Sequence, residues 1–247
     1  MKPLLAMLWA VILLLPSSQT YADTLRVAVA ANFKLAAEEL RQIFEQQTEH
    51  QLKLISASTG VLYNQILHGA PYDLFLAADS ERPLLLEQQQ LAVAGSRVTY
   101  ALGQLVLVHR QDTELSANDL GALLKPGTKI AIANPKIAPY GKAAQQTLLY
   151  LGIDPAQLRI ITSLNVALCY QLWDSGNVDL ALVSASQSQH PEAVKIPSFM
   201  HDRIKQQAIV LDTAKHNSAA WEFMAFMNSP AARSVIVSHG YGLVEPI

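Results

Sequence analysis

The sequence predicts an α/β protein made of two lobes with a ligand cleft between them, and three observations support this prediction. Apolar strand segments alternate with amphipathic helical segments, which is the pattern of a parallel sheet covered by helices. The alternation restarts at residue 129, after an apolar strand passage at 102–108. A second strand passage at 206–211 leads back, so two crossover strands would join the two units. A single larger α/β domain is the alternative that 247 residues also permit.

The first unit begins with a strand at Thr24–Ala30 whose end is continuously apolar, as in a parallel strand buried on both faces. Ala36, Leu40 and Phe44 then recur at helical spacing and predict a helix with one apolar face. The next expected elements are strands at 52–55 and 73–77, a helix that includes Leu62 and Ile66, and a helix from Asp79 or Pro83 through Leu86.

The second unit repeats the alternation, and two helices near the carboxyl terminus complete the chain. We expect its strands at 129–133, 158–162, 179–183 and 194–197, and its helices at 143–151 and 166–173. After a returning strand at 208–211, the last helices are expected at 218–227 and from Pro230 to near Gly240. The resulting domain prediction assigns residues 23–101 and 207–247 to lobe 1 and residues 102–206 to lobe 2.

Residues 1–22 predict a secretory signal peptide. A short basic start precedes an apolar core at 4–15, which Pro16 and two serines end. Small residues follow, so we expect cleavage between Ala22 and Asp23. The apolar core is too short for a comfortable membrane span, and no cysteine follows it to carry a lipid. A retained anchor is the alternative to a mature protein that is soluble outside the inner membrane.

Composition and charge exclude several classes of protein. The chain is 51% hydrophobic and 15% charged, which is typical of a folded protein and not of a disordered one. A formal net charge of −2 supplies no basic field, so we expect no nucleic-acid partner. Cys169 is the single cysteine, so an internal disulfide is impossible. Its apolar helical surroundings indicate a small core residue.

A small-residue turn after the strand at 52–55 is the first candidate binding site. Ser58, Thr59 and Gly60 combine two hydroxyls with a flexible backbone directly before an apolar helix face. The first N–H groups of a helix lack intrahelical acceptors, and the helix dipole is positive there, so this turn could hold an anion. The alternative is that Ser58 only caps the helix. Asn32 also follows a strand, and ligands of parallel sheets bind beyond the carboxyl ends of the strands.

Two turns of the second unit have similar chemistry. The segment 134–141 lies between a strand and a helix, where Gly141 lets the backbone approach a ligand and Tyr140 offers a phenol hydroxyl. The alternative is an ordinary turn in which Tyr140 packs. In the turn at 163–166, Asn165 is expected to cap a helix, and the backbone N–H of Val166 would point into the cleft.

Three longer segments and two terminal motifs form a recognisable combination. They are VAVAANF at 27–33, SASTGVLYNQILHGAPYDLFLAADSERP at 56–83 and IANPKIAPYGKAA at 132–144, with SPAAR and HGYG near the end. This combination resembles the periplasmic molybdate-binding proteins, the substrate-binding components of ABC transporters for molybdate and tungstate. The resemblance implies a type II periplasmic binding fold that holds a tetrahedral oxyanion between its lobes. It also implies a monomer without a cofactor that delivers its ligand to a membrane ABC permease.

The resemblance further implies which residues bind the oxyanion. Many members have serine where Asn32 stands, and an asparagine subgroup is also familiar. Some members supply a tyrosine hydroxyl where this chain has Ser184, so Ser184 is an additional candidate and Tyr140 a possible replacement. The residues that the resemblance places around the ligand, through hydroxyl or backbone N–H groups, are Ala31, Asn32, Ser58, Thr59, Tyr140 and Val166.

The chemistry of these turns agrees with a doubly charged oxyanion. A deprotonated oxyanion has only acceptor oxygens, and the turns offer hydroxyl, amide and N–H donors but no carboxylate. About five to seven charge-assisted hydrogen bonds, each worth roughly 1.5–3 kcal/mol, could support tight binding. Lys34, Lys136 and Lys142 lie near the turns, where we expect them to be solvated and to attract the anion without contacting it.

Other functions remain alternatives at this point. Sulfate has the same charge and shape as molybdate, and the size of a cavity cannot be read from a sequence. A ferric site would require paired tyrosines as ligands, whereas Tyr140 is the single tyrosine in a candidate loop. A secreted hydrolase could use Ser58 with a histidine, yet G-x-S-x-G and H-E-x-x-H motifs are absent, so we expect no enzyme. An interaction module without a small ligand would not explain three loops at strand ends.

Overall fold

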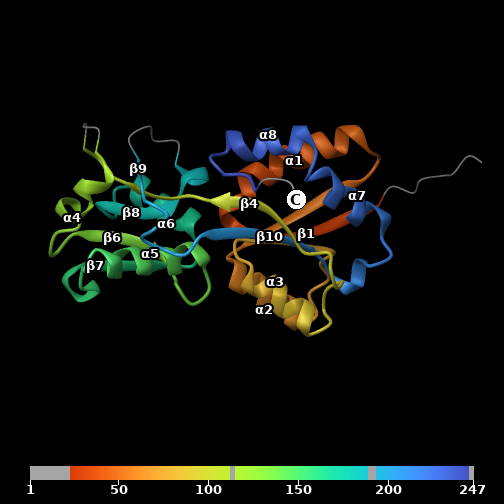
Figure 1. The fold of residues 1–247 in the computed structure, drawn as a ribbon, viewed down its shortest axis with the longest axis horizontal. Coiled ribbons are helices and arrows are strands. Elements are labelled where there is room, and N and C mark those ends of the chain that lie inside the picture. Colours follow the sequence, from red (N-terminus) through yellow and green to blue (C-terminus); the bar gives the residue numbers. More distant parts are fainter. Residues whose placement is uncertain (1–22, 112–114, 189–192, 245–247) are drawn as a thin grey trace, which may run out of the picture.

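The computed structural model describes residues 23–111, 115–188 and 193–244. The expected signal peptide at 1–22 lies outside these ranges. The described chain forms two lobes that lie end to end along the longest axis of the molecule (Figure 1), and each lobe has its own five-stranded sheet. The predicted two-lobed α/β fold is therefore confirmed, and the alternative of a single larger domain is wrong.

Lobe 1 is built on a sheet in the order β2-β1-β3-β10-β4. The first three strands are parallel, whereas β10 runs antiparallel to both of its neighbours. In Figure 1, α1, α7 and α8 cover one face of this sheet, and α2 and α3 cover the other. The strands are β1 Thr24–Ala30, β2 Gln51–Ala57, β3 Leu74–Ala77, β4 Val98–Gly103 and β10 Ile204–Val210. The helices are α1 Lys34–Gln47, α2 Thr59–Leu67, α3 Glu81–Gln88, α7 Ser218–Phe226 and α8 Pro230–Ser238.

Lobe 2 is built on a sheet in the order β7-β6-β8-β5-β9. Its strands β6, β7 and β8 are parallel, and β5 runs antiparallel to β8 and β9. The strands are β5 Leu105–Val108, β6 Lys129–Ala133, β7 Arg159–Ser163, β8 Leu180–Ser184 and β9 Val194–Lys195. The helices are α4 Leu120–Leu123, α5 Pro139–Tyr150 and α6 Val166–Asp174.

Alternation along the central strand β1 explains why lobe 1 has apolar side chains on both faces of its sheet. Val27 and Val29 belong to the cluster under α1, α7 and α8, whereas Ala28 belongs to the cluster under α2 and α3. All three side chains have no exposed surface. A strand buried on both faces reads as a continuous apolar run, which is why the sequence identified it.

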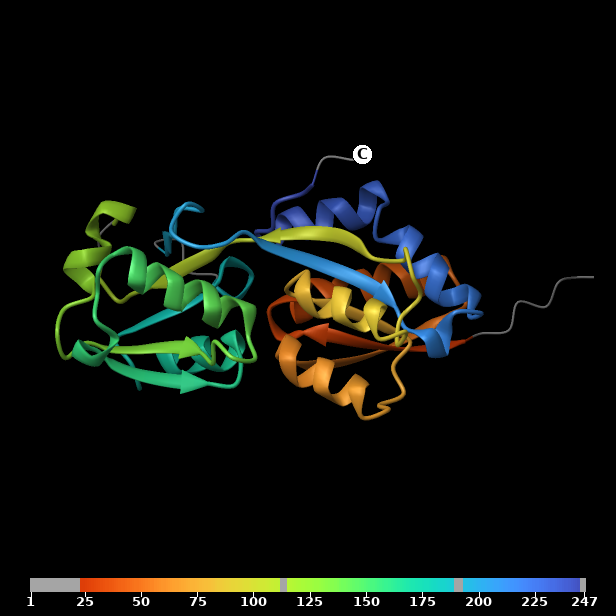
Figure 2. The ribbon, with the colours of Figure 1, turned by 60° about the horizontal axis from the view of Figure 1, so that its bottom comes forward.

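Two adjacent chain passages connect the lobes, as the sequence predicted. The first runs from β4 through Gln104 into β5, and the second enters β10 at Ile204. Figure 2 shows β4 and β10 side by side where the chain crosses between the lobes. The Gln104 amide donates to the carbonyl oxygens of Leu105 and Ile196, both at 2.8 Å, and so ties the two passages together.

The structure changes some expected boundaries. Helix α5 begins at Pro139, four residues before the expected start, because proline suits the first helical position, where its missing N–H costs nothing. Strand β10 begins at Ile204, before both the passage expected from 206 and the strand expected from 208, so the crossing strand is longer than its apolar end suggested. Within the described ranges, no helix has the length and apolar character needed to cross a membrane.

Candidate functional site

The carboxyl ends of parallel strands from both lobes meet at the junction of the lobes. In lobe 1, Ala30 pairs with Ala57, so the turns after β1 and β2 start side by side. In lobe 2, Ala133 pairs with Ser163, which places the turns after β6 and β7 together in the same way. Ligands of such sheets bind beyond these strand ends, so the two pairs of turns define the place to search for a site.

A small cavity lies at this meeting point, with a volume of about 10 Å³. Its walls hold no charged side chain. All six principal residues predicted from the resemblance line it, together with Ala138, Pro139 and Asn165. An oxyanion is larger than this space, so we expect the lobes to move apart when one enters. The predicted residues that line the cavity are Ala31, Asn32, Ser58, Thr59, Tyr140 and Val166.

Three of these residues lie in the first turn of a helix. Thr59 begins α2, Tyr140 is the second residue of α5, and Val166 begins α6. The N–H groups of a first turn have no intrahelical acceptor, and the helix dipole adds partial positive charge there. Three helix starts from two lobes therefore face a single cavity, which favours an anion without any formal counter-charge.

Ser58 has the clearest functional signal. It occupies the N-cap position of α2, yet its hydroxyl makes no capping hydrogen bond. The side chain is 4% exposed, and its Oγ has no hydrogen-bond partner. The alternative that Ser58 serves only as a helix cap is therefore wrong. Asn165, by contrast, caps α6 as predicted by accepting from the N–H of Leu168 at 3.0 Å.

The hydroxyl of Thr59 is held in place from within lobe 1. Its Oγ1 accepts a hydrogen bond from the N–H of Ala78 at 3.0 Å, and the side chain is almost fully buried. Because the oxygen is used as an acceptor, the hydroxyl hydrogen remains available to donate. Thr59 can therefore offer both its hydroxyl and its backbone N–H to an anion.

The Asn32 side chain points toward the hinge, by which we mean the segments of β4 and β10 where the chain crosses between the lobes. Its amide nitrogen donates to Gln206 Oε1 at 2.8 Å and to the Tyr241 hydroxyl at 3.0 Å, which uses both amide hydrogens. The backbone carbonyl oxygen of Asn32 accepts from Ser186 Oγ at 2.8 Å and from the Tyr241 hydroxyl at 2.7 Å. Backbone N–H groups of the turn at Ala31 and Asn32 are consequently the donors that remain for a ligand.

Tyr140 also directs its hydroxyl toward the hinge. The side chain is 2% exposed, and its hydroxyl oxygen accepts from Gln206 Nε2 at 3.2 Å. Burial raises the pKa of Tyr140 well above its ordinary value, and it raises the pKa of the neighbouring Tyr241 to about 12. Both phenols are therefore neutral at physiological pH. The backbone N–H in the first turn of α5 is the group that Tyr140 offers to the cavity.

Ser184 is absent from the described residues that line the cavity. It is buried, its hydroxyl lies 2.8 Å from Ser186 Oγ, and it acts against the raised pKa of Tyr140. Sequence reasoning missed Gln206 and Tyr241, which do not line the cavity. Both accept hydrogen bonds from the Asn32 amide, and Gln206 also donates to the Tyr140 hydroxyl. The sequence did contain an indication for Gln206, which lies directly before the apolar strand expected at 208–211. A polar side chain at such a place is usually buried only when it has hydrogen-bond partners.

Direct contacts close the lobes over the cavity. The N–H of Gly60 donates to the carbonyl oxygen of Ile137 at 2.8 Å. A Cβ at Gly60 would lie 2.8 Å from both the Cα and the carbonyl oxygen of Ile137, so glycine permits this approach. Arg82, which pairs with Asp79, reaches across to the carbonyl oxygen of Lys136 at 3.1 Å. Burial raises the pKa of Asp79, while Arg82 acts against that shift.

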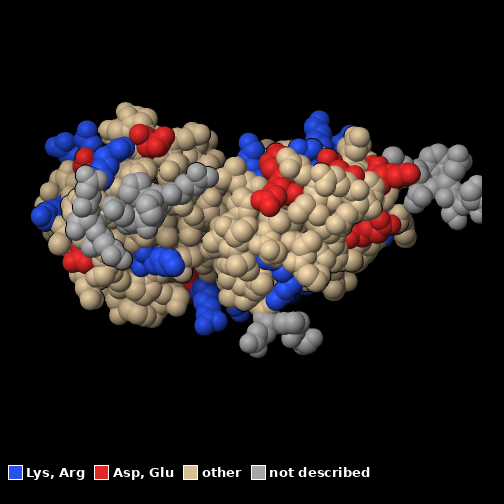
Figure 3. Space-filling model, turned by 90° about the horizontal axis from the view of Figure 1, so that it is seen from above, with Lys and Arg blue, Asp and Glu red and all other residues tan. Residues whose placement is uncertain are grey.

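The charged residues lie outside the cavity. Lys34, Lys136 and Lys142 are exposed, as predicted. A separate hollow of about 320 Å³ at the junction has mixed charge. Figure 3 shows basic and acidic residues interspersed over both lobes on one face of the molecule. No group of three His, Cys, Asp or Glu side chains suited to a metal ion occurs within the described ranges. The basic residues of the hollow are Arg82, Lys136, Lys142, Arg203 and Lys205, and its acidic residues are Asp79, Glu81 and Asp202.

Two lobes, two crossing strands and a donor-lined cavity between helix starts define a solute-binding protein. Comparison with known proteins agrees, because the pattern of the family described as "Bacterial extracellular solute-binding protein" matches residues 25–242. The chain belongs to this family.

Individual relatives are more specific. The chain is 37% identical over 231 residues to the molybdate-binding protein ModA of Azotobacter vinelandii, covering 90% of this chain and 91% of the relative. It is 34% identical over 219 residues to ModA of Rhodobacter capsulatus, covering 87% and 86%. The solved structure of the periplasmic molybdate-binding protein of A. vinelandii aligns with a TM-score of 0.84 at 35% identity, covering 90% of this chain and 100% of that one.

Proposed function

We propose that this protein captures molybdate between its two lobes and delivers it to a membrane ABC permease. The observation that carries this proposal is the cavity lined by neutral donors from both lobes, with the unpartnered hydroxyl of Ser58 in its wall. The similarity to molybdate-binding proteins over nearly the whole chain supports the same ligand.

Hydrogen-bond donors alone would recognise this ligand. Molybdate at neutral pH is a doubly charged tetrahedron whose oxygens only accept, so each oxygen can be matched by a hydroxyl or an N–H group. Hydrogen bonds to a charged acceptor are about twice as strong as neutral ones, which compensates for the loss of hydration. The helix starts of α2, α5 and α6 add partial positive charge at the same point.

The proposal gives each cavity residue a role. Ser58 donates its hydroxyl, and Thr59 donates its hydroxyl and backbone N–H. Tyr140 and Val166 donate backbone N–H groups from lobe 2. The turn at Ala31 and Asn32 donates from the lobe 1 backbone, while the Asn32 side chain fixes that turn through Gln206 and Tyr241. Ser184 supports Tyr140 in place of contacting the ligand.

Several further properties belong to the same proposal. Tungstate shares the charge and shape of molybdate and would bind as well. The mature chain from Asp23 would act in the periplasm as a monomer, without a cofactor and without turning over its ligand. The two bodies that move against each other when the cleft opens would be the two sheets with their helices, so the expected divisions at 101/102 and 206/207 shift by a few residues to the end of β4 and the start of β10.

Parallel calorimetry with molybdate, tungstate, sulfate and phosphate on the mature chain tests the proposal. We expect one molybdate or tungstate ion per chain and much weaker binding of sulfate, whose shorter bonds suit a smaller cavity. Protonated phosphate should bind poorly, because no carboxylate lines the cavity to accept its hydrogen. Binding of sulfate more tightly than molybdate, or no heat with any of the four anions, would refute the proposal.

A further inference from the structure

A single buried side chain, Gln206, contacts the binding turns of both lobes. Gln206 lies on the crossing strand β10 and has no exposed surface. Its Oε1 accepts from the Asn32 amide at 2.8 Å and from the Tyr100 hydroxyl at 3.1 Å. Its Nε2 donates to the Tyr140 hydroxyl at 3.2 Å. Asn32 belongs to the lobe 1 wall of the cavity and Tyr140 to the lobe 2 wall, whereas Gln206 does not line the cavity.

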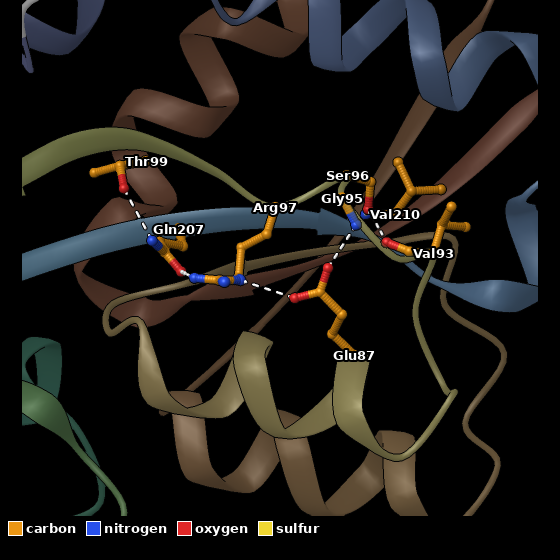
Figure 4. A network of polar contacts seen from close by, with 8 residues as sticks. All are labelled: Glu87, Val93, Gly95, Ser96, Arg97, Thr99, Gln207 and Val210. Atoms are coloured by element: carbon orange, nitrogen blue, oxygen red, sulfur yellow. Dashed lines mark hydrogen bonds and ion pairs between the residues drawn. The ribbon is translucent and has the colours of Figure 1, made fainter. Parts of the chain in front are cut away.

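The backbone at Gln206 is irregular and firmly held. The pairing of β10 with β4 shifts register between Gln206 and Gln207. Such bulges re-aim side chains and are frequent beside functional sites. Figure 4 shows how Gln207 is fixed: its Oε1 accepts from Arg97 at 3.1 Å, and its Nε2 donates to Thr99 at 2.9 Å. Arg97 in turn pairs with Glu87 of α3 at 3.2 Å. The irregular segment is therefore anchored within lobe 1.

Tyr140 approaches this segment from lobe 2. A Cβ on Gly103, the last residue of β4, would lie 2.2 Å from the Tyr140 hydroxyl oxygen. Gly103 thus leaves the space that the hydroxyl occupies at the point where the chain crosses between the lobes. Tyr140 consequently joins two regions, since its backbone lies in the first turn of α5 at the cavity and its hydroxyl lies beside Gly103 of β4 and Gln206 of β10.

We propose that the hydrogen bond between Gln206 and Tyr140 holds the lobes in the arrangement that retains the ligand. This inference rests on the proposed function and assigns Gln206 as a positioning residue that acts through Asn32 and Tyr140. Opening of the lobes separates α5 from β10 and breaks the bond. Both groups are buried in the closed form, so the bond is made away from water and stabilises that form.

A bond that is made on closing governs release more than capture. Ligand enters the open form, in which the bond is absent, so its removal should not lower the association rate and should raise it only by the increase in the open fraction. The closed form loses stability, so the dissociation rate should rise. A purely structural role would instead lower the melting temperature and leave both rates as they are.

Kinetics of molybdate binding, followed by tryptophan fluorescence in a stopped-flow instrument, provide the test. Tyr140→Phe removes the hydroxyl and keeps the backbone N–H, and Gln206→Met keeps the approximate length of the side chain. We expect the dissociation rate to rise about five- to tenfold in Tyr140→Phe, as for loss of one ordinary hydrogen bond. The rise should be larger in Gln206→Met, which also removes the acceptor for Asn32. The double variant should show less than the product of the two effects.

Tyr72→Phe is the matched control. It removes a tyrosine hydroxyl that donates to Gln65 at 2.8 Å entirely within lobe 1, so both rates should equal those of the wild type. Unchanged dissociation rates in Tyr140→Phe and Gln206→Met, or fully independent effects in the double variant, would overturn the hinge role while leaving the proposed function intact.

A measurement without ligand separates the two proposals. Small-angle scattering of the ligand-free proteins should give a larger radius of gyration for Tyr140→Phe and Gln206→Met than for the wild type and Tyr72→Phe. Equal radii in all four proteins would overturn the inference. A wild type that binds no molybdate would refute the proposed function alone, because the scattering comparison still tests whether this bond holds the lobes together.

Discussion

Two serines at helix N-caps show how the same residue can serve stability or binding. Ser229 caps α8 by accepting from the N–H of Ala232 at 3.2 Å, which is the usual role of serine at this position. Ser58 occupies the same position of α2 without such a bond, and its buried hydroxyl has no partner. A buried polar group without a partner costs free energy, so the fold keeps this hydroxyl at the expense of stability.

Substitution of Ser58 therefore separates binding from folding. Ser58→Ala should weaken molybdate binding about tenfold to a hundredfold, as expected for one charge-assisted hydrogen bond. Its melting temperature should not fall, because no cap is lost. Ser229→Ala should do the opposite, with unchanged binding and a stability loss of about 1 kcal/mol. Calorimetry and thermal denaturation measure both effects, and equal affinity of Ser58→Ala and wild type would remove Ser58 from the site.

At the scale of residues, sequence reasoning succeeded for local features. The cap at Asn165 and the core position of Cys169, whose pKa burial raises to about 11, follow from neighbouring residues. The directions of the Asn32 and Tyr140 side chains were not predictable. Their shared partner Gln206 lies 174 and 66 residues away in the chain, and only the assembled lobes bring it into contact.

At the scale of elements, the start of helix α2 contacts the loop before α5 in the opposite lobe. Gly60→Ala should weaken molybdate binding at least about tenfold, because a Cβ there would push Ile137 away and hold the lobes apart. Gly121→Ala is the control, since Gly121 lies in α4 with open space around it and should leave affinity unchanged. Calorimetry decides, and a Gly60→Ala protein with wild-type affinity would show that this approach is dispensable.

Helix α3 is linked to the loop before β4 and to β10 by an acid-dependent contact. The N–H of Gly95, together with Arg97, lowers the pKa of the Glu87 carboxyl below its ordinary value (Figure 4). A lowered folded-state pKa contributes stability that is present above the unfolded pKa, near 4.5, and is lost as pH falls through the folded pKa. Glu87→Gln should therefore lose stability at neutral pH and converge on the wild type in acid.

Thermal denaturation from neutral pH to about pH 3 would check the role of Glu87. Arg41 pairs with Glu38 and Glu45 within the single helix α1, so Glu38→Gln serves as a control for a surface carboxyl. A difference between Glu87→Gln and wild type that stayed constant down to the lowest pH would contradict this account of the contact.

Elements were predictable where their residues carry a local pattern. Buried parallel strands such as β1 and β6 show continuous apolar runs, and α1 shows helical spacing. The first half of β10 was missed because Lys205, Gln206 and Gln207 interrupt the apolar pattern. Those glutamines are buried by partners from other elements, so the strand is defined by tertiary contacts rather than by its own sequence.

At the scale of the whole molecule, two lobes are joined by two crossing passages, and we expect them to open and close as rigid bodies. Molybdate should therefore reduce the radius of gyration in small-angle scattering and raise the melting temperature by mass action. At about one hundred times the dissociation constant the stabilisation should be about 2.7 kcal/mol. Sulfate at the same concentration is the control. An unchanged scattering profile with saturating molybdate would indicate a rigid site.

The two-lobed arrangement was predictable because the strand–helix alternation restarts and two strand passages link the units. The closed contact between the lobes was not, since it depends on the carbonyl of Ile137 meeting the N–H of Gly60 across the junction. Neither residue type signals that contact by itself. Local patterns thus indicate which turns face the junction, while the closeness of the turns is a property of the assembled molecule.

The anomalous scattering of molybdenum in crystals grown with molybdate tests the central claim most directly. The account predicts one strong peak inside the cavity. The oxygens of the ion at this peak should accept hydrogen bonds from Ser58 Oγ and from the backbone N–H groups of Tyr140 and Val166. A peak found only in the charged hollow beside Lys142 and Arg203 would contradict it, because the ion would then be held by surface cations and not by neutral donors from both lobes.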